Sequence, residues 1–414
     1  VAPVPTVDDL AKAADVAADL AAPVADAAPP ADGPKASSDD IDLSALGLDP
    51  GAAAFDDKLN IYGFADIGWS SQHWVRKIPT IPKDTRAFAV GNLNIYLAKN
   101  LTSKARTLAE VRFTFLPNGS QNPDGTYLDN SAEETTNFNR VSQWGGVVIE
   151  RAYLEYDLTE HLTLRAGRWL TPYGIWNIDH GSPAILGVIR PYIVGEQFFP
   201  EHQTGLDLFG DYYQSGFKLD YHLTASNGRG AAEAQTDVDL DVALGANATL
   251  ETPWGVKLGG SYYRGRYTGF AATPGGLNPT FQESSYGVDA QYDLGPLHAQ
   301  VEVIARERTY DDGARTATAA GFSPDSRDLG FYCLLGYRFA RLWNVMPYGI
   351  YERYEPGEGA FFKGIKSMSA GLNFRPTGSM IFKVQTSRTA FDTGPELLAG
   401  QKLYFLAAQA SWVF

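Results

Sequence analysis

From Leu59 to the C-terminus, the chain consists of runs in which polar and apolar side chains alternate, and the connections between these runs alternate in length. About sixteen runs can be counted. Alternation with a period of two is the pattern of a β-strand that separates a polar from an apolar environment. Every second connection is expected to be a turn of two to four residues, and the expected turns are 100–102, 159–161, 212–215, 252–255, 295–296, 341–344 and 376–379.

Strict alternation of short and long connections places all the long loops at one end of an antiparallel sheet. Transmembrane β-barrels have this arrangement, with an even number of strands, short turns on one side of the membrane and longer loops on the other. No run of 18 apolar residues occurs, so a transmembrane helix is not expected. The sequence therefore predicts an all-β fold, a transmembrane antiparallel β-barrel of about 16 strands over residues 58–414.

The last strand carries a more specific signal. Alternate positions are apolar from Tyr404 to the terminal Phe414, and this pattern resembles the signature by which outer-membrane barrels are recognised for assembly. The chain begins at Val1 without an apolar leader, which is compatible with a mature form whose signal peptide has been removed. We therefore expect a multi-pass barrel in the outer membrane of a Gram-negative cell, with outer-membrane lipid around it.

Residues 1–57 differ in composition from the rest of the chain and are expected to form a periplasmic extension. They are rich in Ala, Asp and Pro and carry a net charge of −10, which leaves −4 for the remaining residues. A segment that buries so little apolar surface can stay disordered. Alternatively, it is an arm that docks a periplasmic protein or the cell wall. The nearly balanced remainder lacks the basic footprint of a nucleic-acid-binding protein.

The alternation also assigns side chains to the barrel interior. If Val301 and Val303 face lipid, then Gln300 and Glu302 face the lumen. An Arg or Lys at the lipid midplane would cost roughly 2–4 kcal/mol. Charged side chains within the strands are therefore expected inside, around a water-filled pore.

One connection, 171–203, is about thirty residues long and rich in Pro, Gly and aromatic residues. Loops longer than about 12–15 residues without structure of their own are usually functional, so we expect this one to fold inward and narrow the channel. Its acids would face basic wall residues and create a transverse field that sorts solutes. Alternatively, the same groups form ion pairs that hold the loop down. The residues expected at the pore lining or constriction are Arg112, Arg151, Arg165, Asp179, Glu196, Glu201, Arg306 and Lys383.

Two stretches around this loop, GRWLTPYG at 167–174 and IRPYIVGEQFFPEHQTGLDLFG at 189–210, resemble the porin family related to phosphate-selective porins. The resemblance implies a homotrimer of sixteen-stranded channels. Phosphate-selective members line their path with repeated Arg and Lys. This chain mixes Glu110, Glu155 and Glu302 among its bases, so the ion preference stays open.

An enzymatic alternative rests on His222 and the run Ser226–Arg229, which resembles part of the signature of outer-membrane phospholipases. Four residues along a strand span about 13 Å at roughly 3.3 Å per residue, beyond the hydrogen-bond reach that a Ser/His pair needs. A turn at Asn227 and Gly228 is the better interpretation. The chain has one cysteine, Cys333, and no HExxH or CxxC motif, so neither an enzyme nor a cofactor is expected.

Together, these patterns predict an outer-membrane porin for passive diffusion of small hydrophilic solutes or ions. The alternative is a structural barrel whose N-terminal arm docks a periplasmic partner or the cell wall.

Overall fold

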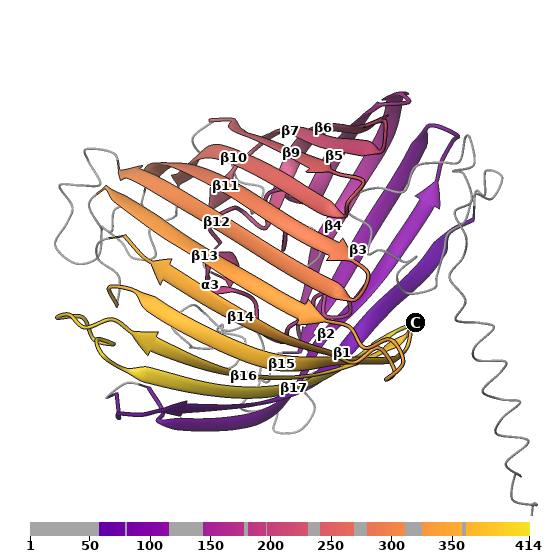
Figure 1. Cartoon of the computed structure of the whole chain (residues 1–414). Helices are drawn as coiled ribbons and strands as arrows, with labels where there is room; N and C mark the ends of the chain where they lie inside the picture. Colours follow the sequence, from indigo (N-terminus) through magenta and orange to yellow (C-terminus); the bar gives the residue numbers. More distant parts are fainter. Residues whose placement is uncertain are drawn as a thin grey trace, which may run out of the picture.

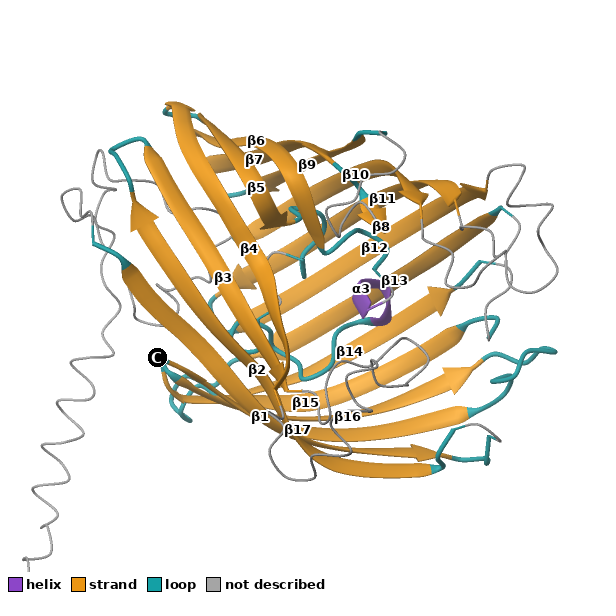
Figure 2. Cartoon of the chain, turned by 180° about the vertical axis from the view of Figure 1, so that it is seen from behind, coloured by secondary structure: helices purple, strands orange, loops and turns teal. Residues whose placement is uncertain are grey.

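Sixteen long antiparallel strands form one closed barrel in the computed structural model (Figures 1 and 2). The structure describes residues 58–78, 81–115, 144–177, 181–195, 197–230, 241–268, 280–310, 325–357 and 362–414. The extension expected over residues 1–57 lies outside this range. The long strands are β1 (Asn60–Trp74), β2 (Asp84–Asn100), β3 (Ala105–Phe115), β4 (Trp144–Thr159), β5 (Leu162–Leu170), β6 (His202–Gln214), β7 (Phe217–Ser226), β9 (Ala243–Glu251), β10 (Val256–Thr268), β11 (Thr280–Leu294), β12 (Leu297–Tyr310), β13 (Ser326–Tyr337), β14 (Met346–Glu355), β15 (Ile365–Thr377), β16 (Met380–Phe391) and β17 (Lys402–Val413).

Each long strand pairs with its neighbours in sequence, and β1 closes the barrel by pairing with both β2 and β17. The two-residue β8 (Arg229–Gly230) is an addition that pairs in parallel with β10. Closure gives every long strand two hydrogen-bonded neighbours, which a sheet in lipid requires. The predicted all-β barrel is confirmed.

The predicted alternation of connections is also confirmed, with short turns at one end of the barrel and longer loops at the other. Some boundaries differ: the connection between β13 and β14 spans 338–345 rather than 341–344, and that between β6 and β7 spans 215–216 rather than 212–215. On the long-loop side, β1 continues to Trp74, and nine residues connect it to β2. The end of β1 is polar from Ser70 to His73, and its register with β2 continues to His73 opposite Asp84. His73 and Asp84 are also joined by a hydrogen bond, with 2.6 Å between Nδ1 and Oδ1. A strand can continue past an apolar band where its side chains meet water.

Side chains alternate between the two faces of the barrel wall as expected. On β13, Tyr332 and Leu334 are buried inside the barrel, whereas Cys333 and Leu335 are exposed on its outer surface. On β12, Glu302 is buried and Val301 is exposed. Large aromatic side chains lie at the end with the short turns, including Trp254, 65% exposed, and Trp343, 72% exposed. Aromatic residues at this level are typical of the girdles at membrane interfaces.

The main apolar core lies inside the barrel rather than between two layers. It forms where the long connection between β5 and β6 packs on the inner wall, and Figure 2 shows its single helical turn, α3 (Tyr192–Gly195), within the barrel. Loop residues such as Trp176 and Phe198 contact wall residues such as Tyr332 and Tyr354. Among the described residues, no helix is long and apolar enough to cross a membrane.

Candidate functional site

The β5–β6 loop leaves β5 and reaches the inner faces of β10 and β12. The backbone N–H of Gly174 donates to Ser261 Oγ at 3.0 Å, and that of Ile175 donates to Glu302 Oε1 at 3.3 Å. Gly174 has φ +73°, and a Cβ there would lie 2.0 Å from Glu302 Oε1. A larger residue could neither adopt this backbone conformation readily nor approach the wall so closely. Gly174 therefore directs the loop across the interior.

The middle of the loop is tied to β15 and β16 by polar side chains that point inward. Lys383, 1% exposed, donates from Nζ to the carbonyls of Ser182 and Gly187 at 2.5 and 3.1 Å. The neighbouring inward residue, Gln385, accepts from the backbone N–H of Val188 at 2.7 Å and of Ile189 at 3.1 Å. On β15, Asn373 and Arg375 donate to the carbonyls of Leu186 and Pro183.

The returning part of the loop is held in the same way by other strands. Glu352 on β14 accepts from the backbone N–H of Tyr192 at 2.7 Å. Arg306 on β12 donates to the carbonyl of Gln197 at 3.1 Å, and Ser285 on β11 donates to that of Phe198 at 2.5 Å. The hydroxyl of Thr171 donates to the carbonyl of Pro200, which joins the two ends of the loop. The loop is therefore fixed to the inner wall over most of its described length.

The wall formed by β3 to β7 carries a buried network of ion pairs. Arg165 is fully buried and lies 2.7 Å from Glu155 and 3.1 Å from Asp207. Its guanidinium also lies 4.7 Å from the ring centre of Tyr153 and 4.4 Å from that of Phe209. Cation–π contacts of this kind add to the stability of a desolvated guanidinium.

Two other predicted arginines belong to the same wall network. Arg151 Nε donates to Glu110 Oε2 at 2.6 Å, and Arg112 Nη1 donates to Glu150 Oε1 at 2.7 Å. Glu150 also contacts His202. All three predicted wall arginines, Arg112, Arg151 and Arg165, thus lie inside the barrel with carboxylate partners from the wall.

Of the three predicted loop acids, the structure describes Glu201, which forms an ion pair with Arg190 of the same loop, with 2.8 Å between Oε1 and Nη1. The carboxylates beside Arg165 come from the neighbouring strands: Arg165 lies directly opposite Glu155 on one side and Asp207 on the other, and such cross-strand neighbours meet most easily. Asp179 and Glu196 lie outside the described residues.

Several residues that shape this site were missed from the sequence. Asp207 and Glu150 sit at inward positions, and strand parity combined with a register could have identified them. The loop anchors Ser285, Glu352 and Asn373 give no comparable signal, because inward polar residues are common on every strand.

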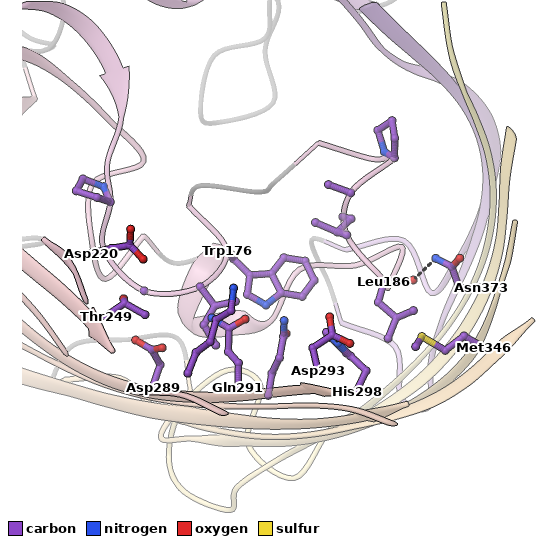
Figure 3. Close-up of a pocket in the computed structure, with 18 of the residues that line it drawn as sticks. Trp176, Leu186, Asp220, Thr249, Asp289, Gln291, Asp293, His298, Met346 and Asn373 are labelled. Carbon is purple, nitrogen blue, oxygen red and sulfur yellow. Dashed lines mark hydrogen bonds and ion pairs between the residues drawn. The ribbon is translucent and has the colours of Figure 1, made fainter. Parts of the chain in front are cut away.

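A cavity of about 510 Å³ lies beside the loop, and its wall residues come largely from the strand ends near the short turns (Figure 3). Trp176 and Leu186 contribute apolar surface from the loop. The wall contributes charges of both signs, namely Lys218, Asp220, Lys257, Asp289, Asp293, Arg338 and Arg375. Such a lining offers hydrogen-bonding and charged groups to water or to a polar solute.

The residues of the enzymatic alternative do not assemble a Ser/His pair. His222 stacks on Phe209, and its Nδ1 lies 3.1 Å from Asp207. The hydroxyl of Ser226 accepts from the backbone N–H of Gly228, whose φ of +82° marks the expected turn. In the described part of the chain, no group of His, Cys, Asp and Glu side chains could hold a metal ion.

Comparisons with known proteins identify the fold. No family model and no curated protein sequence matches the chain. Among solved structures, the anion-selective porin from Comamonas acidovorans gives a TM-score of 0.57 at 9% identity, over 86% of this chain and 99% of that one. The outer membrane channel DcaP of Acinetobacter baumannii gives 0.53 at 12% identity, over 87% and 100%. Salmonella typhi OmpF, in complex with daunomycin, gives 0.50 at 12% identity, over 86% and 98%.

These structures define the class of the protein, a porin-like β-barrel. Because the sequence identities are so low, the similarity concerns the fold alone. The resemblance to phosphate-selective porins in particular stays a prediction.

Proposed function

We propose that the protein is an outer-membrane porin through which small hydrophilic solutes or ions diffuse passively, and that the 171–203 loop narrows its water-filled lumen. The observation that carries this proposal is the attachment of the loop backbone to inward side chains of β10, β11, β12, β14, β15 and β16. A loop held across the interior by so many contacts reduces the open cross-section of the lumen. The exposed apolar side chains on the outer surface of the barrel are compatible with contact to lipid.

In this proposal, the predicted site residues take two roles. Lys383 and Arg306 hold the loop, since both donate to its carbonyls. Arg112 borders the path together with the loop pair Glu201 and Arg190, since these side chains stay partly exposed, at 26%, 16% and 30%. Arg151 and Arg165 are buried behind these side chains. Their role is structural, because their ion pairs hold the charged part of the wall in place. Asp179 and Glu196 remain proposed constriction residues.

We further propose that the barrel assembles as a homotrimer in the outer membrane, as the resemblance implies. Because most described wall charges are paired with opposite charges, size rather than net charge would dominate the selection of solutes.

Planar-bilayer recording tests the proposed function. The purified full-length chain should produce discrete current steps proportional to voltage, and its liposomes should swell in small sugars. A barrel that inserts but stays closed to ions and to sugars would contradict a diffusion channel.

A further inference from the structure

Cations gather on the outer surface of β14 to β17, at the end with the long loops. Lys366 on β15, Arg388 on β16 and Lys402 on β17 are all exposed. In the strand register, Lys366 lies opposite Ala390 and Ala390 lies opposite Lys402. Adjacent strands are about 4.8 Å apart, so the backbones of the two lysines are about 10 Å apart. Arg388, two residues along β16, completes a triangle around Ala390.

Two acidic residues lie near these cations, and both form ion pairs with the same arginine. Arg353 on β14 forms ion pairs with Asp392 at 2.6 Å and with Glu355 at 2.8 Å. Within the described residues, Lys366, Arg388 and Lys402 form no ion pair. The pKa of the Asp392 carboxyl lies below its usual value. The largest cause is the hydrogen bond from Arg353, and the positive charges of Arg353, Lys366 and Lys363 lower the pKa further. Positive charge therefore exceeds negative charge on this surface.

The surface below this triangle, toward the short turns, is apolar. Met368, 62% exposed, lies opposite Arg388 on β15, and Tyr404 lies opposite it on β17. Val384 and Leu406 continue the exposed apolar surface. A soluble anion would contact only the cations and would leave the apolar surface unused. A molecule with phosphate groups above hydrocarbon chains would match both parts of the surface.

We propose that Lys366, Arg388 and Lys402 bind the phosphate groups of a phosphorylated glycolipid in the outer leaflet, while Met368 and Leu406 contact its acyl chains. Basic side chains near a membrane surface attract anionic headgroups, and a guanidinium can bind phosphate through two parallel hydrogen bonds. Long loops mark the external end of such barrels, so the triangle lies at the level of the outer leaflet. This inference rests on the proposed placement in the outer membrane.

The test measures lipid binding to the detergent-solubilised full-length chain by native mass spectrometry, with diphosphorylated lipid A as the probe. Its monophosphorylated form, phosphatidylethanolamine and inorganic pyrophosphate are the comparison ligands. We expect diphosphorylated lipid A to bind most tightly. In the variant with Lys366→Ala, Arg388→Ala and Lys402→Ala, its affinity should fall roughly 100-fold.

The matched control removes three exposed cations from the outer surface at the same end of other strands, with Arg86→Ala, Arg264→Ala and Arg327→Ala. This control should keep the affinity of the unmodified chain. Three results would overturn the lipid site. The two triple variants could lose affinity equally, the lipids could bind equally tightly whatever their number of phosphates, or pyrophosphate could bind as tightly as diphosphorylated lipid A. Bilayer currents from the same preparations separate the two proposals: open channels without lipid preference refute only the lipid site, and absent currents refute the channel.

Discussion

Replacement of residues 181–195 by a short Gly–Ser linker is expected to raise single-channel conductance roughly twofold or more, because a pore conducts according to its narrowest section. This segment contains α3 and the five loop backbone groups that Lys383, Gln385 and Asn373 bind. Without it, water can fill the space against β14 to β16. The measurement is the size of current steps in planar bilayers, together with the largest polyethylene glycol that still reduces them.

Two variants of β16 provide a matched comparison. Lys383→Met with Gln385→Leu keeps the loop but removes donors and acceptors for four of its backbone groups, so its current should fluctuate between levels. Val384→Leu changes the lipid-facing residue between these two positions and should leave the current unchanged. Conductance that is the same with and without residues 181–195 would show that the loop does not limit the channel.

Arg165→Met is expected to destabilise the barrel by about 3–5 kcal/mol, because removing one partner of a buried ion pair leaves an uncompensated charge. Here two carboxylates, Glu155 and Asp207, would lose the guanidinium between them. The free energy of unfolding can be measured from denaturant titrations in detergent micelles, with tryptophan fluorescence as the signal.

The control for this substitution is Arg327→Met on the outer surface. Arg327 is 67% exposed by its side chain and lies 3.8 Å from Glu307, and exposed pairs contribute about 0–1 kcal/mol. If both substitutions changed stability equally, the ion network of β3 to β7 would have no special role in holding the wall.

The sequence predicts the barrel wall well because one physical constraint repeats at every strand. Alternate side chains must point to the outer surface and to the barrel interior, as Val301 and Glu302 do, and the short turns follow from the strand ends. The path of the loop obeys no such rule. Its anchors, such as Glu302 and Lys383, are single side chains more than a hundred residues away along the chain.

The pairing of charges shows the same limit. Strand parity correctly places Arg165 inside, but only the register of β4, β5 and β6 reveals that Glu155 and Asp207 lie opposite it. The ion pair between Glu201 and Arg190, both in the loop, likewise depends on the folded path of the loop. Charge partners therefore depend on a register that composition and periodicity do not fix.

Labelling of single cysteines with a water-soluble, membrane-impermeant methanethiosulfonate tests most directly whether water fills the barrel and lipid surrounds it. In a Cys333→Ala background, Gln291→Cys and Gln300→Cys place thiols opposite each other on the inner face of β11 and β12, where they line the cavity. Ala290→Cys and Val301→Cys place a second facing pair one residue away on the outer face. Each substitution is made alone, so that facing thiols cannot form a disulfide. The reagent should reduce the bilayer current of both inner variants and leave both outer variants unaffected. Equal reaction on both faces, or reaction only on the outer face, would contradict a water-filled channel in lipid.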